Sequence, residues 1–178
     1  MVYARRLVKE ALRTKGETLT NYQPSERLKN YLKSQENCAE WNEALGVFMP
    51  YADSGGISTI GWGHRLTHVD INSGIFNYGL SQLGCDRLFE QDLSVHIKFV
   101  NNIDLQGLTQ GQFDALVDLS YNAGFAAVKT VQRLGLQNAP STFMTFVHDK
   151  HGNELKGLVK RRKQDVAWWS GAAEGSIA

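Results

Sequence analysis

Apolar residues recur every three or four positions along most of the chain, which is the spacing of an amphipathic helix. The longest such stretch covers about residues 81–101, and its apolar stripe consists of Cys85, Leu88, Phe89, Leu93, Ile97 and Val100. A shorter stripe follows Ser25, whose side chain suits a helix N-cap, and it consists of Leu28, Tyr31 and Leu32. The pattern therefore predicts a first helix over about 26–37 and the longest helix of the chain over 81–101.

The second half of the chain has the same helical spacing. Thr109 is followed three residues later by Gln112, which is the form of a capping box, and the helix that it opens stops near Asn122 and Gly124. This helix carries little charge, so we expect it at the centre of the core. Further helices are expected over 126–136, 141–148 and 155–169, the last of them basic.

Between Pro50 and His64 the composition changes to PYADSGGISTIGWGH, in which glycines and β-branched residues replace the helical pattern. The Ser-Gly-Gly cluster in its middle is a turn signal. We expect a compact hairpin in which residues 51–53 turn into residues 57–62, followed by an irregular stretch to about Tyr78. Helices around one small glycine-rich hairpin indicate an α+β fold.

The first residues have a different character from the rest. Apolar residues at helical spacing alternate with basic ones over residues 4–15, which predicts a short amphipathic helix, and residues 16–23 have the composition of a linker. Such a helix either contacts a membrane surface or packs on the main body. We therefore divide the chain into an N-terminal helix and linker, 1–23, and one domain, 24–178.

Composition narrows the class of protein. With 178 residues, 42% of them hydrophobic, the chain can bury one core, and 19 Lys+Arg against 18 Asp+Glu leave a charge of only +1. No DNA-binding motif accompanies the basic segments, so we expect no nucleic-acid partner. Because no apolar run of about 18 residues occurs, we expect no stable membrane insertion. Because no signal sequence is recognisable, we expect the protein to stay in the cytoplasm unless another device exports it.

Cysteine and histidine content argues against a metal site. Cys38 and Cys85 are too few for a disulfide framework and lack zinc-ligand pairing, so we expect both to be reduced thiols. His64 has no second His or Cys at ligand spacing. We therefore expect neither a metal nor another cofactor.

Carboxylates flank the predicted hairpin, with Glu36, Glu40 and Glu43 before it and Asp53 within it. Hydrolysis of a glycosidic bond needs two carboxyl groups, one kept protonated by an apolar setting and one ionised in a polar setting. The alternatives are solvated surface carboxylates for the glutamates and a cap on the tight turn for Asp53.

Several stretches, in chain order, resemble the phage lysozyme (endolysin) family, including its T-even-type members: LKNYLKSQENC, YADSGGISTIGWGH, RLFEQDLSVH, LTQGQFDALVDLSYNAG and GLVKRR. The resemblance covers about residues 25–169. It implies a lysozyme-like fold in which a small lobe with a glycine-rich β-hairpin, about 36–80, is joined by a long helix, about 81–101, to a larger all-helical lobe, about 102–178.

The resemblance also implies a function. It points to an endolysin that hydrolyses the β-1,4 bond between N-acetylmuramic acid and N-acetylglucosamine of the peptidoglycan glycan strand during host lysis. We expect a monomer that waits in the host cytoplasm for a membrane pore and then acts on the cell wall from the periplasm. The alternatives are a lytic transglycosylase and a catalytically silent peptidoglycan-binding module.

The general acid implied by the resemblance is Glu36, which ends the first helix. The family, however, places its hairpin Asp closer to its Glu, whereas Asp53 follows Glu36 by 17 residues and Glu43 by 10. Either residues 38–45 are an insertion that loops away and leaves Glu43 exposed, or Glu43 is the acid. The helical register favours Glu36, because the apolar stripe leads up to it.

The remaining roles also follow from the resemblance. Asp53 and Thr59 would hold the attacking water. His64 would face Asp92 and tie the two lobes together. The residues Asn122, Arg161 and Arg162 would lie near the site, with the two arginines approaching the acid Glu or saccharide oxygens.

Overall fold

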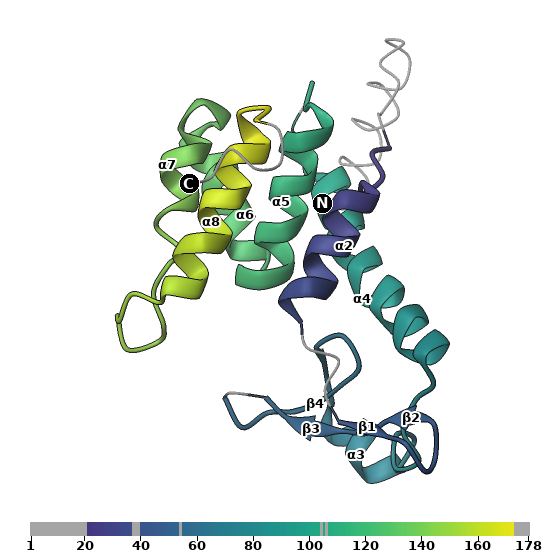
Figure 1. The fold of residues 1–178 in the computed structure, drawn as a ribbon. Helices are drawn as coiled ribbons and strands as arrows, with labels where there is room; N and C mark the ends of the chain where they lie inside the picture. Colours follow the sequence, from purple (N-terminus) through teal and green to yellow (C-terminus); the bar gives the residue numbers. More distant parts are fainter. Residues whose placement is uncertain (1–20, 37–39, 54, 104, 106, 173–178) are drawn as a thin grey trace, which may run out of the picture.

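The computed structural model describes residues 21–36, 40–53, 55–103, 105 and 107–172. The helix predicted over residues 4–15, most of the predicted linker and Cys38 lie outside these residues. Figure 1 shows two lobes, a small one that holds the strands and a larger one made of helices, with the long helix α4 (Gln82–Asn102) running between them. The predicted α+β architecture, with a small lobe joined by a long helix to a helical lobe, is confirmed (Figure 1). Among the described residues, no helix combines the length and apolarity needed to span a membrane.

Helix α5 (Gln110–Ala123) forms the centre of the larger lobe. The predicted capping box of Thr109 and Gln112 begins it, and every side chain from Phe113 to Ser120 is buried. The surrounding elements are α6 (Phe125–Leu134), the 3-10 helix η1 (Leu136–Asn138), α7 (Ala139–Phe143) and α8 (Lys156–Trp169). The expectation of a helix over 141–148 is wrong in its bounds, because Pro140 in the first turn starts α7 earlier and α7 ends after five residues.

Helix α2 (Glu26–Gln35) also belongs to the helical core, since Leu28 and Leu32 are fully buried in it. Its predicted N-cap is confirmed, with the Ser25 side chain accepting the N–H of Leu28. The end of the predicted linker is fixed as well, because the Tyr22 ring stacks on Phe113 at 5.2 Å.

The small lobe is built on the predicted hairpin. Strands β3 (Tyr51–Ala52) and β4 (Ser58–Ile60) pair antiparallel, and β5 (His64–Arg65) extends the sheet on the far side of β4. Residues 63–78 are more regular than expected, because a capping box between Thr67 and Asp70 begins a short helix, α3 (His68–Ser73). The expectation of an irregular stretch there was wrong.

The segment before the hairpin forms a second small sheet, of β1 (Trp41–Asn42) and β2 (Val47–Phe48). Reciprocal backbone hydrogen bonds between Phe48 and Leu80 join it to the chain just ahead of α4. Glu43 lies in the turn between these strands and is exposed, as expected for an insertion over residues 38–45.

Candidate active site

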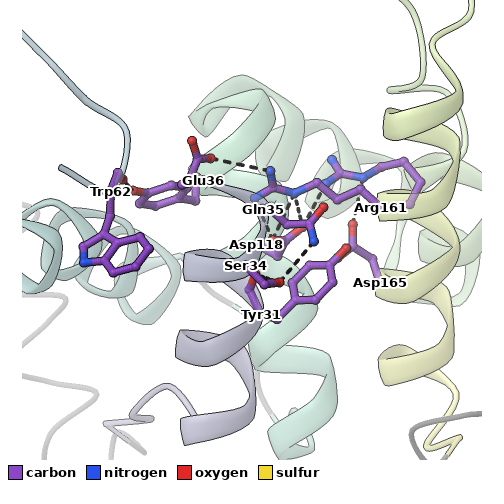
Figure 2. Close-up of polar contacts among 10 residues, drawn as sticks. Tyr31, Ser34, Gln35, Glu36, Trp62, Asp118, Arg161 and Asp165 are labelled. Atoms are coloured by element: carbon purple, nitrogen blue, oxygen red, sulfur yellow. Dashed lines mark hydrogen bonds and ion pairs between the residues drawn. The ribbon is translucent and has the colours of Figure 1, made fainter. Parts of the chain in front are cut away.

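Glu36 is the residue that ends α2, and its backbone N–H still donates to the Leu32 carbonyl. Its side chain is 28% exposed. It lies against the backbone of Gly63, so closely that a Cβ on Gly63 would come within 2.6 Å of Glu36 Oε2. Figure 2 shows the carboxyl group between Trp62 and Arg161. The helix therefore places one carboxyl group where the two lobes meet.

The surroundings of Glu36 favour its protonated form. Burial is the main cause that raises its pKa above the ordinary value, and the negative charges of Asp118 and Asp53 act in the same direction. Arg161, whose Nη1 lies 3.9 Å from Glu36 Oε1, and Arg65 oppose this effect. Because the net shift is upward, the carboxyl group keeps its proton to a higher pH than an exposed glutamate would.

Arg161 reaches this position from α8 while it is bound to Asp118 of α5. Its Nε and Nη2 both donate to that carboxylate, with Nη2 2.9 Å from Oδ1. The predicted approach of Arg161 to Glu36 is confirmed, at the 3.9 Å given above. Figure 2 shows the guanidinium with Glu36 on one side and Asp118 on the other.

The same expectation is wrong for Arg162, which is fully buried. Its Nη2 donates to Asp118 Oδ2 at 2.9 Å, and its Nε lies 2.8 Å from Asp165 Oδ2. Successive residues on a helix point about 100° apart, and here Arg161 extends to Glu36 while Arg162 extends to Asp165, although both bind Asp118. Arg162 belongs to the interior of the helical lobe.

Asp53 follows strand β3 and shapes the turn that leads to β4. Its Oδ1 accepts the N–H groups of Gly55, at 2.8 Å, and Ile57, at 2.9 Å, which is the turn-capping role considered as the alternative. A carboxylate has a second oxygen, so the cap does not use the whole group. Thr59 is buried on β4, and its hydroxyl donates to the Ile57 carbonyl at 3.0 Å.

The predicted contact between His64 and Asp92 is confirmed, with Nδ1 2.8 Å from Oδ2. It joins β5 to α4, and the hydrogen bond raises the pKa of His64 although burial opposes the shift. Asn122 is exposed at the end of α5. Its neighbour Tyr121, which the sequence did not single out, donates its hydroxyl to the Trp62 carbonyl at 3.2 Å and so ties α5 to the chain beside Glu36.

Two further residues of the site were missed from the sequence. Gly63 is needed because of its contact with Glu36 and its left-handed φ of 84°. Asp118 is needed because it holds Arg161. A carboxylate inside the apolar run FDALVDLSY was the available signal, since a buried Asp requires a partner. Within the described residues, no group of three or more His, Cys, Asp or Glu side chains is arranged to hold a metal ion.

Comparison with known proteins places the chain in a family. The phage lysozyme family model matches residues 43–165. The endolysin of Salmonella phage P22 is 31% identical over 121 residues, which are 66% of this chain and 82% of that protein. The endolysin of Bacillus phage B103 is 32% identical over 113 residues, 60% of this chain, but the chain spans only 41% of that longer protein.

A solved structure supports the same fold. The endolysin from Escherichia coli O157:H7 phage FAHEc1 superposes with a TM-score of 0.63 at 21% identity, over 83% of this chain and 93% of that one. The family match covers more than half of the sequence and includes the hairpin, α4, α5 and most of α8. The chain therefore belongs to the phage lysozyme family, a family of lysozyme-type enzymes of cell-wall degradation.

Proposed function

We propose that the protein is an endolysin that hydrolyses the β-1,4 bond between N-acetylmuramic acid and N-acetylglucosamine in the host's peptidoglycan, with Glu36 as the general acid. The observation that carries this proposal is the setting of Glu36, partly buried between the lobes with its pKa raised. A carboxyl group in such a setting can donate a proton to the leaving glycosidic oxygen. Glu43, exposed in the β1–β2 turn, lacks this setting.

Asp53 is proposed to orient the attacking water with Thr59. Its Oδ1 is held by two backbone N–H groups, which fix the carboxylate relative to the hairpin. The negative charge of Asp53 also raises the pKa of Glu36, so the two carboxyl groups influence each other electrostatically. Water placed by Asp53 would attack the anomeric carbon while Glu36 protonates the leaving oxygen.

The deciding experiment compares Glu36→Gln with Glu43→Gln in a turbidity assay on outer-membrane-permeabilised cells. We expect Glu36→Gln to lose lysis by about 1,000-fold or more, and Glu43→Gln to match the wild type. The two substitutions are chemically identical, so the second controls for the loss of a negative charge. Full activity of Glu36→Gln together with inactive Glu43→Gln would reassign the acid, and a wild type that binds cell walls without clearing them would indicate a binding module.

Product analysis separates hydrolysis from transglycosylation. If water is the nucleophile, the released muropeptides carry reducing muramic acid ends, which mass spectrometry detects. Anhydro-muramic ends would instead indicate a lytic transglycosylase. Asp53→Asn is the matching variant, because an amide oxygen still accepts the two turn N–H groups while the negative charge is lost. We expect it to fold normally and to lose hydrolysis.

A further inference from the structure

Two buried aspartates lie one turn apart on α5, and only one of them is linked to the candidate acid. Asp118 accepts three hydrogen bonds from Arg161 and a fourth from Arg162. Asp114 accepts hydrogen bonds from the backbone and hydroxyl of Ser25, at the other end of α2 from Glu36. Both aspartates are fully buried. Asp118 therefore differs from Asp114 in that it binds Arg161, which lies beside Glu36.

The way in which Asp118 holds Arg161 determines which part of the guanidinium faces Glu36. The Nε and Nη2 edge is occupied by the aspartate, and Nη1 is the atom nearest to the glutamate, at 3.9 Å. An unrestrained arginine pairs with a carboxylate through two parallel hydrogen bonds of about 2.8 Å. The observed distance is longer, so the arginine is beside the acid but not paired with it in this way.

We propose that Asp118 is a positioning residue, which holds Arg161 by its inner edge and so prevents the guanidinium from closing on Glu36 as a two-pronged ion pair. The inference rests on the proposed role of Glu36 as the acid. A carboxyl group in such an ion pair would have a lowered pKa, so it would be ionised and would have no proton to donate. Asp118 thereby allows a cation to lie next to a group that must stay protonated.

The balance of charge around Glu36 is consistent with this role. The charges that act on its pKa are those of Arg161 from α8, Asp118 from α5, Arg65 from β5 and Asp53 from the hairpin turn. Arg161 and Asp118 influence it in opposite directions. Removing one member of this buried pair exposes Glu36 to the charge of the other, so the two removals should have opposite effects.

Tyr121 is a further titratable group near Glu36, and it does not complicate the test. Burial raises its pKa above the ordinary value for a phenol, and the charge of Glu36 adds to that shift. Its hydroxyl therefore stays neutral over the acidic to neutral range in which a glutamate titrates.

The test measures the titration of Glu36 directly, by ¹³C NMR of the carboxyl carbons, with the spectrum of Glu36→Gln identifying the resonance. The variants are Asp118→Asn, Arg161→Gln and, as the matched control, Asp114→Asn. We expect the Glu36 midpoint to fall by about one pH unit in Asp118→Asn and to rise by a similar amount in Arg161→Gln. Asp114→Asn should leave the midpoint unchanged although it removes an equally buried charge from the same helix.

The pH profile of lysis gives the second readout. In Asp118→Asn the alkaline limb should move to lower pH together with the Glu36 midpoint. If the midpoint moves and the limb does not, Asp118 positions Arg161 as proposed but Glu36 is not the acid. An unchanged midpoint in Asp118→Asn overturns the positioning role. If that variant does not fold, Arg161→Gln decides. A Glu36 midpoint that does not rise in Arg161→Gln would mean that Arg161 does not lower the pKa of Glu36, which overturns the proposal.

Discussion

The two lobes hold their charged groups in different ways. The helical lobe buries them, each at most 5% exposed: Asp114, Asp118, Arg161, Arg162 and Asp165, of which the last four are linked by ion pairs. In the small lobe, carboxylates are bound by nearby backbone, as Asp53 is by the N–H groups of its own turn and Asp70 is by that of Thr67. A buried charge requires partners from distant parts of the chain, whereas a turn carboxylate needs only its neighbours.

This difference explains how the candidate site is divided. The helical lobe supplies Glu36 and the network that fixes Arg161, so the candidate acid is attached to the buried helical core. The small lobe supplies Asp53 on a short hairpin whose geometry is local. The comparison predicts that changes in the helical network mainly lower stability, while changes in the small lobe mainly affect activity.

The largest effect is expected from Arg162→Leu. The substitution leaves the buried carboxylates of Asp118 and Asp165 without the cation that lies within 2.9 Å of each, and breaking a buried ion pair from one side costs about 3–5 kcal/mol. The exposed neighbour Lys163 provides the control, and Lys163→Leu should change the free energy of unfolding by about 0.5 kcal/mol or less. Urea denaturation measures both, and equal stabilities would contradict the importance of the buried network.

A smaller loss of stability, accompanied by a loss of activity, is expected from Gly63→Ala. The left-handed backbone costs about 1–2 kcal/mol with any side chain, and the new methyl group would collide with the Glu36 carboxyl. Gly152 has nearly the same φ, 86° against 84°, with open space around it, so Gly152→Ala isolates the backbone cost. We expect similar melting shifts but about 100-fold lower lysis only in Gly63→Ala. Equal activities would show that Glu36 tolerates the displacement.

The long helices could be predicted because their apolar residues recur every three or four positions along the sequence. The stripe over 81–101 became α4 (Gln82–Asn102), and the Thr109 capping box became the start of α5. Sheet β1–β2 could not be predicted, since strands of two residues are too short to alternate visibly. Its place is determined by the pairing of Phe48 with Leu80, a contact between segments distant in sequence.

The site was only partly predictable for a similar reason. Family motifs placed Arg161 and the His64–Asp92 contact correctly. They did not reveal Asp118, whose partner Arg161 lies 43 residues further along the chain. Nor did they separate Arg161 from Arg162. The two arginines differ in which face of α8 they occupy relative to α5, and the motif does not show this.

His64→Asn tests the connection between the lobes. Because the folded pKa of His64 is raised, the stability from its bond to Asp92 is fully present below the unfolded pKa, about 6.5, and is lost as pH rises through the folded value. The variant should be about 1 kcal/mol less stable near pH 5.5 and approach the wild type above pH 8. His68→Asn, at an exposed position, is the control for the substitution itself. A deficit independent of pH would indicate packing instead of an ion pair.

The smallest effect is expected at His96, one helical turn from Asp92 on α4 but directed into the helical lobe. Burial lowers its pKa, and its Nδ1 lies 2.8 Å from the Ser120 hydroxyl. A histidine with a lowered folded pKa contributes stability that is present above the unfolded pKa and is lost as pH falls, because the unfolded chain binds the proton first. Relative to His96→Gln, the wild type should therefore lose roughly 0.5 kcal/mol between pH 8 and pH 5, the opposite sign to His64. Urea titrations at the two pH values measure the difference. If the stability contributions of His64 and His96 changed with pH in the same direction, the two lobes would not differ in whether they stabilise a protonated histidine.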